Sequence, residues 1–190
     1  MKIFNVILIS AASVFFTSVS SAQINNSDSA STGTAYSRIA NDTVATNFIT
    51  QATLGNLKEI NAGKLAVRKG QNASVKSFAA RMIKDHTKAT ADMQKILLSK
   101  KFIVAPPSSA NVAPDAMLSN ANGAKFDTNY ISMMMQDHVK TIQLFENAAD
   151  KVQDQDLKAF AVKTLPILKE HLKMDKAIAK QLNITTADSM

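Results

Sequence analysis

The sequence predicts an all-α fold: a four-helix bundle made of two helical hairpins that are joined by a long crossover connection. From Asp42 onward the apolar residues recur with the period of an α-helix, in four blocks of similar length. Short turns follow the first and third blocks, and a longer connection rich in proline follows the second. The chain shows no stretch of alternating apolar and polar residues, which is the pattern of a half-buried strand.

The first hairpin has start and stop signals at both of its helices. Its first helix is expected to cover residues 42–69 and to end at Gly70, a residue typical of helix C-termini. Its second helix is expected to run to about Lys101. Asn72 or Ser74 can cap the start of this second helix, because both side chains accept hydrogen bonds from free backbone N–H groups.

The second hairpin follows a connection that cannot be helical throughout. Residues 102–124 contain three prolines and many small polar residues, and proline interrupts a helix. The third helix is expected over residues 125–152. Asp154 can cap the fourth helix, which ends near Leu182. One long crossover between two hairpins is the connectivity of ferritin-like bundles, so we expect a ferritin-like domain over residues 42–183, followed by a tail over 184–190.

The N-terminus has the pattern of a secretory signal peptide over residues 1–22. Lys2 gives a positive start, Ile3 to Val19 is largely apolar, and Ala22 ends a run of small residues suited to cleavage. The apolar part is shorter than the roughly 20 residues that span a bilayer, so an uncleaved anchor is the less favoured alternative. Residues 23–41, rich in Ser, Asn and Thr, are expected to form a flexible leader. These patterns place the protein in the periplasm or elsewhere in the cell envelope, with no transmembrane segment in the mature chain.

Composition excludes some classes of function. The chain of 190 residues has no cysteine, which excludes thiolate catalysis and zinc sites built on cysteine. Its net charge of +7 could favour association with anionic envelope surfaces. The basic residues are interleaved with acidic ones and few aromatic residues accompany them, so we expect no nucleic-acid partner.

The three histidines of the chain, each on a different expected helix, are the strongest functional signal. At about 100° per residue, His86 and His138 lie at the centre of apolar faces, and His171 lies within the apolar face of the fourth helix. Asp175 shares that face one turn further on. The first helix contributes Glu59, whose neighbours on the same face are mostly small and leave space beside the carboxylate.

Depth along the bundle places these groups at one level. Glu59 and His86 stand about equally far from the first turn, and His138 and His171 about equally far from the last one, at roughly 1.5 Å per residue. Three imidazoles and a carboxylate that converge in a helical core can ligate a divalent metal. We therefore predict a site for one transition metal, Zn, Fe, Mn or Cu, with Asp175 as an alternative ligand or a hydrogen-bond partner of a ligand.

Two other interpretations of these core residues remain open. The same groups could form a metal-free hydrogen-bond network, with Glu59 and Asp175 bonded to the imidazoles. Methionine thioethers on the buried faces suit Cu(I), although methionine at helical spacing usually fills gaps in a core. These methionines are Met82, Met93, Met134 and Met135.

Three further residues near the histidines have an ambiguous role. Asp85 and Asp137 each precede a histidine and lie towards the edge of the apolar face, where they could meet solvent or hydrogen-bond an imidazole. Pro166 lies inside the fourth helix and is expected to kink it. The bend could wrap the helix around the core or steer His171 inward.

Four segments of the chain form a distinctive combination: FITQATLGNLKEINAGKLA, VKSFAARMIKDHTKA, FDTNYISMMMQDHVKTIQLFENAA and LKAFAVKTLPILKEHL. Together they resemble a family of exported bacterial proteins of unknown function, often labelled "predicted outer membrane protein" (domain of unknown function four-one-four-two). The resemblance covers about residues 43–182 and implies a ferritin-like fold and an envelope location, without an established reaction.

The chain departs from ferritin-like di-iron enzymes at the ligand positions. Those enzymes place a Glu three residues before a His on two helices, but here Ile83 and Leu168 occupy these positions. Glu146 lies at the edge of the apolar face of the third expected helix. Too few carboxylates face inward for a di-iron centre, so ferroxidase or oxygenase activity is not expected.

The sequence thus supports three hypotheses in order. The first is an envelope protein with a buried His/Glu metal site. The second is a structural or interaction module of the envelope, with no catalytic role and a metal-free polar core. An enzyme ranks last, because the chain has no nucleotide-binding or phosphate-binding glycine motif and no Ser-His-Asp order.

Overall fold

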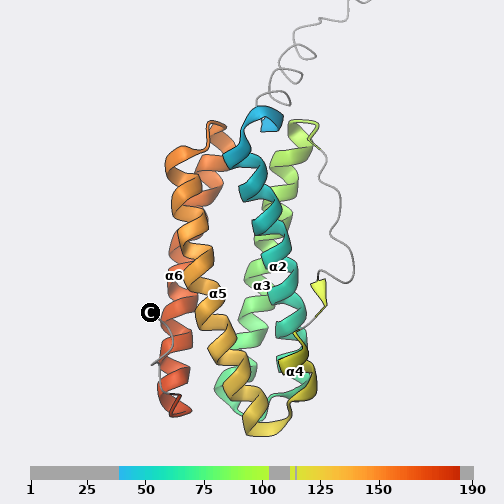
Figure 1. The fold of residues 1–190 in the computed structure, drawn as a ribbon, viewed down its shortest axis with the longest axis vertical. Helices are drawn as coiled ribbons and strands as arrows, with labels where there is room; N and C mark the ends of the chain where they lie inside the picture. Colours follow the sequence, from blue (N-terminus) through green and yellow to red (C-terminus); the bar gives the residue numbers. More distant parts are fainter. Residues whose placement is uncertain (1–38, 103–111, 114, 185–190) are drawn as a thin grey trace, which may run out of the picture.

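The computed structural model describes residues 39–102, 112–113 and 115–184, and these residues form an all-helical structure without a strand, as the sequence predicts. Most of the elements are long helices that lie side by side (Figure 1). They are α2 (Thr43–Lys69), α3 (Ala73–Ser99), α4 (Ala116–Asn120), α5 (Gly123–Lys151) and α6 (Gln155–Gln181). The expected signal peptide, most of the leader and most of the tail lie outside the described residues.

Two features of the chain differ from the expected outline. Residues 39–41, assigned to the leader, are helical, and Ile39 is fully buried. The connection expected over residues 102–124 contains the short helix α4, whose Leu118 is also fully buried. None of the helices in the described ranges is long and apolar enough to cross a membrane.

The helix starts follow the predicted capping residues. The side chains of Asn72 and Asp154 each accept hydrogen bonds from two backbone N–H groups in the first turn of α3 and α6. Gly70 ends α2, but its φ of −60° is not left-handed. A Cβ at this position would lie 2.7 Å from the carbonyl oxygen of Ala66. Gly70 is therefore suited to this turn by its lack of a side chain, rather than by its tolerance of positive φ.

Two aspartates connect the hairpins at opposite ends of the helices. At one end, the buried Asp127 of α5 accepts hydrogen bonds from the backbone N–H groups of Gln71 (3.1 Å) and Asn72 (2.8 Å), in the turn between α2 and α3. At the other end, Asp42 caps α2 through one oxygen and accepts from the N–H of Gln153 (3.0 Å) through the other. These bonds fix the height of one hairpin relative to the other.

The four long helices form a ring of neighbours, in which α2 packs against α3 and α5, and α6 packs against α5 and α3. Their apolar faces make two separate core clusters. One includes Phe48 and Phe145, whose rings meet edge to face with centroids 4.9 Å apart. The other includes Phe78 and Tyr130. On each long helix, buried polar residues lie between the two clusters.

Two glycines of α2 face different surroundings. A Cβ at Gly63 would lie 3.0 Å from Cγ1 of Ile83 and 3.2 Å from the carbonyl oxygen of Ala79, so Gly63 allows α2 to approach α3 closely. A Cβ at Gly55 would meet nothing within 4 Å. The space that the sequence predicts beside Glu59 is thus present at Gly55 and filled by α3 at Gly63.

These surroundings predict opposite effects for one substitution. Gly55→Ala should stabilise the protein by up to about 1 kcal/mol, because alanine favours the helix and meets no neighbour. Gly63→Ala should leave the protein less stable than Gly55→Ala by about 1–3 kcal/mol, because the new methyl group overpacks the contact with α3. Urea unfolding of both variants measures this difference. Equal stabilities would show that α2 and α3 can separate without cost.

Candidate metal centre

A layer of buried polar side chains crosses the helices between the two apolar clusters. Glu59 of α2 and His86 of α3 are each 3% exposed, and His138 of α5 and His171 of α6 are fully buried. Asp175, one turn beyond His171, is fully buried as well. The three imidazoles form a group that could share one metal ion, and Glu59 approaches this group through His86 and Asp175 through His138.

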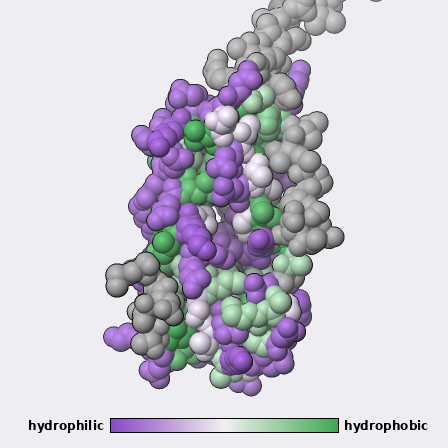
Figure 2. All heavy atoms as spheres, in the orientation of Figure 1, coloured by the Kyte–Doolittle hydropathy of each residue, from purple (hydrophilic) through white to green (hydrophobic). Residues whose placement is uncertain are grey.

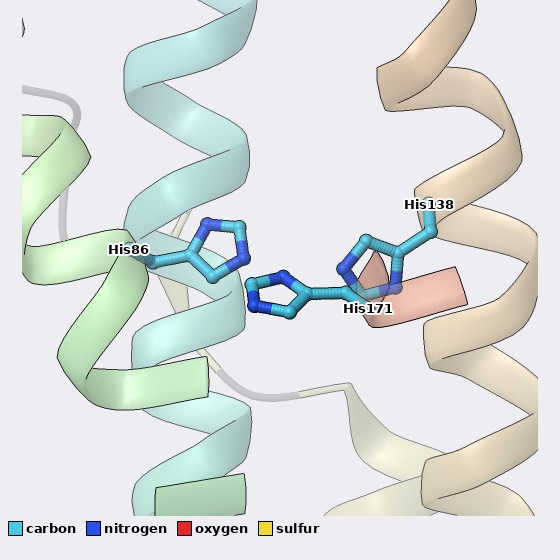
Figure 3. A group of neighbouring side chains, drawn as sticks. All are labelled: His86, His138 and His171. Carbon is cyan, nitrogen blue, oxygen red and sulfur yellow. The ribbon is translucent and has the colours of Figure 1, made fainter. Parts of the chain in front are cut away.

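The three imidazoles point toward one another from three helices (Figure 3). The ring centroids of His86 and His138 are 6.1 Å apart, and that of His171 lies 5.4 Å from each. One nitrogen from each ring lies within 4.8 Å of the others. The edge of the Phe78 ring packs near His138 and His171 on the side of the second apolar cluster.

The environment of His138 defines which of its nitrogens carries the proton. Its Nδ1 lies 2.7 Å from Oδ2 of Asp175 and 2.9 Å from the carbonyl oxygen of Met134. Because a carboxylate and a carbonyl only accept hydrogen bonds, Nδ1 must be the donor. In the neutral ring, Nε2 then keeps a lone pair directed at the other histidines.

The other two histidines are bonded on one nitrogen in the same way. His171 Nε2 donates to Oδ2 of Asp85 at 2.9 Å. His86 Nδ1 lies 2.8 Å from the side-chain oxygen of Asn56, which stands one turn before Glu59 on α2. Each imidazole thus has one nitrogen held by a fixed partner, an arrangement that orients metal-binding histidines and sets their tautomer.

The inward atoms of the layer have no hydrogen-bond partner. They are His86 Nε2, His138 Nε2, His171 Nδ1 and Glu59 Oε2. Glu59 Oε2 is 2.8 Å from His86 Nε2, close enough for an ion pair, but the geometry is not that of a hydrogen bond. Buried polar atoms without partners cost about 1–3 kcal/mol each. Two ligands that bind one metal at bond lengths of about 2.0–2.1 Å lie roughly 3 Å from each other. The 2.8 Å between Glu59 Oε2 and His86 Nε2 is close to this separation.

The carboxylates of the layer have pKa values shifted in opposite directions. Burial alone raises the pKa of Glu59, but the three neighbouring imidazoles outweigh it, so its pKa is lowered and the group is ionised. Burial raises the pKa of Asp175 to about 6, and its bond to His138 only partly offsets that. Glu59 therefore brings a negative charge to the centre.

The histidines also differ from one another. Burial lowers the pKa of His171 to about 4, with Asp85 opposing the shift and the other two imidazoles adding to it. Burial acts in the same direction on His138, but Asp175 and Glu59 outweigh it and raise its pKa. At neutral pH His171 is thus uncharged, with the lone pair of Nδ1 free to bind a cation.

Several contacts around the centre differ from the sequence interpretation or were missing from it. Asp85 does bond an imidazole, but that of His171 across the bundle rather than its neighbour in sequence. Asn56 was not selected, and its position on the same face as Glu59, three residues earlier, is the only signal for it.

Tyr130 is another buried group that was not selected from the sequence, and its hydroxyl has no partner. Asp137 is partly buried, and burial together with Glu59 raises its pKa.

The methionines of the buried faces pack in the apolar clusters, and Pro166 does not interrupt its helix. All four methionines on the buried faces belong to the apolar clusters, as expected for core filling: Met82, Met134 and Met135 in one, and Met93 in the other. Pro166 lies inside α6, which continues on both sides of it.

The family model described as "Domain of unknown function (DUF4142)" matches residues 29–178, most of the chain. The chain belongs to this family, in agreement with the resemblance of its four segments. No curated protein and no solved structure gives a match.

The low pKa of His171 predicts how the metal-free protein responds to acid. The unfolded chain binds a proton at this residue near pH 6.5, whereas the folded chain does so only near pH 4, so acidification through this window destabilises the fold. His171→Gln removes this effect, and its unfolding free energy should fall less between pH 7 and pH 5, by about 2 kcal/mol. Asp175, whose pKa is about 6, acts in the opposite sense but is present in both proteins.

Urea unfolding of chelator-treated protein at the two pH values measures this difference. Asp150→Asn serves as the control, because Asp150 is an exposed residue of α5 outside the polar layer, and it should keep the pH dependence of the wild type. The same pH dependence in the wild type and His171→Gln would contradict the expected low pKa.

Proposed function

We propose that this protein is an exported, ferritin-like helical bundle that holds one divalent transition metal in its core. One residue from each long helix supplies a ligand: Glu59, His86, His138 and His171. The observation that carries the proposal is the division of roles among the ring nitrogens. In each imidazole, one nitrogen contacts a fixed hydrogen-bond partner. The other nitrogen has no partner and faces the space between the three rings (Figure 3).

The donor set favours borderline metals. Imidazole suits Zn, Cu and Fe, and a single carboxylate is also compatible with Mn. The nearby thioethers lie in the apolar clusters, which gives no support to a site selective for Cu(I). Three neutral imidazoles and one carboxylate would leave a charge of +1 on a divalent ion.

A metal at this centre would join all four long helices. Each helix contributes one ligand, so that binding free energy would appear directly as stability of the folded chain. This suits metal holding or a metal-stabilised envelope module. We propose no reaction for this centre.

The location and the ferritin-like classification rest on sequence patterns. The basic start, apolar stretch and small residues of 1–22 support export to the periplasm or cell envelope. The absence of cysteine is compatible with an oxidising compartment. The long connection between α3 and α5 supports the crossover of a ferritin-like bundle.

A metal-free polar network in a structural or interaction module is the second candidate. It is favoured by the 2.8 Å approach of Glu59 to His86 and the 2.7 Å approach of Asp175 to His138, both of which could be ion pairs. However, it leaves His138 Nε2 and His171 Nδ1 without partners. A metal would give a partner to both nitrogens and to Glu59 Oε2, so it is the better explanation of these three atoms.

Metal analysis of the mature chain tests the proposal. Residues 23–190, purified without a His-tag or chelator and titrated with Zn, Cu, Fe and Mn, should bind one equivalent of metal. His138→Ala should abolish binding, and Asp150→Asn, a charge change at an exposed position of the same helix, should not affect it. A protein that stays empty would favour the metal-free network. In that case His138→Leu should still destabilise the fold by about 3–5 kcal/mol, because it leaves the buried Asp175 without its partner.

The contact between Asp175 and His138 predicts an effect on affinity without loss of a ligand. Asp175→Asn can still accept the hydrogen bond from His138 Nδ1, but it removes the charge that makes the imidazole a stronger donor to the metal. Metal affinity should fall by about 10–100-fold at pH 7. Competition with a chelator of known affinity measures it, with Asp150→Asn as the control. An unchanged affinity would mean that His138 is not a ligand.

A further inference from the structure

The face formed by α2 and α5 is hollowed directly outside Glu59. Two adjoining cavities, of about 480 Å³ and 240 Å³, share Lys58, Glu59 and Asp137 in their walls. We call them together the α2–α5 pocket. Figure 2 shows this face, with hydrophilic residues around a hollow near its middle. Glu59 therefore belongs both to the inner centre and to the wall of a pocket.

Glu59 connects the pocket to the histidines. Its side chain is almost wholly buried, and its Oε2 has no hydrogen-bond partner. That oxygen lies 2.8 Å from His86 Nε2. A cation that reached Glu59 from the pocket would thus be one ligand exchange away from the imidazoles.

The lining of the pocket is suited to a cation. Among the described residues, three carboxylates line the two cavities, those of Glu59, Asp115 and Asp137, against the ammonium groups of Lys58 and Lys140. This local excess of negative charge occurs in a chain whose net charge is +7. The wall also contains apolar residues and three neutral oxygen-bearing side chains, and such oxygens suit hydrated divalent ions. The three neutral side chains are Asn129, Ser132 and Gln136.

The opposite face offers a narrower opening. A groove between α3 and α6 reaches His86 and His171, but its cavity is only about 60 Å³. The α2–α5 pocket is therefore the larger of the two openings toward the polar layer. In the part of the chain that the structure describes, two lysines and two aspartates line the groove, so their charges balance, whereas carboxylates outnumber ammonium groups in the larger α2–α5 cavity.

We propose that the α2–α5 pocket is the route by which a hydrated divalent cation reaches the core, with Asp137 and then Glu59 as its successive oxygen ligands. The proposal rests on the proposed metal centre. It adds a binding role for Asp137, which lies in the pocket wall and is not among the ligands of the inner centre.

Uptake kinetics of the mature chain test this route. Co²⁺ is mixed with metal-free protein, and its visible absorption is followed in a stopped-flow instrument, with affinity measured separately at equilibrium. Asp137→Asn should slow uptake by about tenfold, the lower range of electrostatic effects on association, and change the dissociation constant by less than about threefold. Asp150→Asn, exposed on the same helix, should leave both unchanged.

Blocking variants separate the two faces. Ser132→Trp places a large side chain in the α2–α5 pocket and should slow uptake, whereas Ile167→Trp, at the groove between α3 and α6, should not. If Ser132→Trp fails to fold, the uptake rate of Asp137→Asn decides the test by itself. Wild-type uptake rates for Asp137→Asn, or slower uptake only for Ile167→Trp, would overturn the route while leaving the metal centre intact. A wild-type protein that binds no metal at equilibrium would overturn the centre and the route together.

Discussion

The structure depends on one constraint: polar groups buried at the middle of a helical core must be held in place by other polar groups. The most enclosed example is the bond between His138 and Asp175, since both side chains are fully buried. Neither residue could keep its position if the other turned away, because an unpaired charge would remain in the core. The pair therefore requires α5 and α6 to keep one relative rotation and height. Similar bonds relate α2 to α3 through Asn56 and α3 to α6 through Asp85.

The ends of the bundle support the same alignment. Asp127 holds the turn between α2 and α3, and Asp42 holds the turn between α5 and α6. A hairpin that slid along the other by one helical turn, about 5.4 Å, would break these bonds and move its histidines out of the layer. Short turns and end contacts thus set the level at which the imidazoles meet, before any ligand binds.

Much of this arrangement follows from the sequence because it depends on helical period and residue count. The inward direction of His86, His138 and His171 follows from the period, and their common level follows from the distances to the turns. The caps at Asn72 and Asp154 were also predictable, since a capping residue acts on its own chain within three positions. These are local properties, and the structure confirms them.

The features that the sequence could not predict depend on contacts between helices. The bond from Asp85 to His171 requires the rotamers of two side chains on different helices, which no periodicity determines. The helix α4 lies in a segment whose prolines only indicate interruption. Gly55 and Gly63 look alike in the sequence, yet one adjoins open space and the other a neighbouring backbone.

The polar layer also divides the hydrophobic core into two halves. In most helical bundles the apolar seam is continuous, so that the ends fray first and the middle opens last. Here the apolar clusters lie toward the ends, and the middle of each long helix contacts imidazoles and carboxylates. Without a cation, local opening should therefore be easiest at the polar layer, midway along the long helices. A cation bound as proposed would tie all four long helices at this level, so that the two halves would unfold as a single cooperative unit.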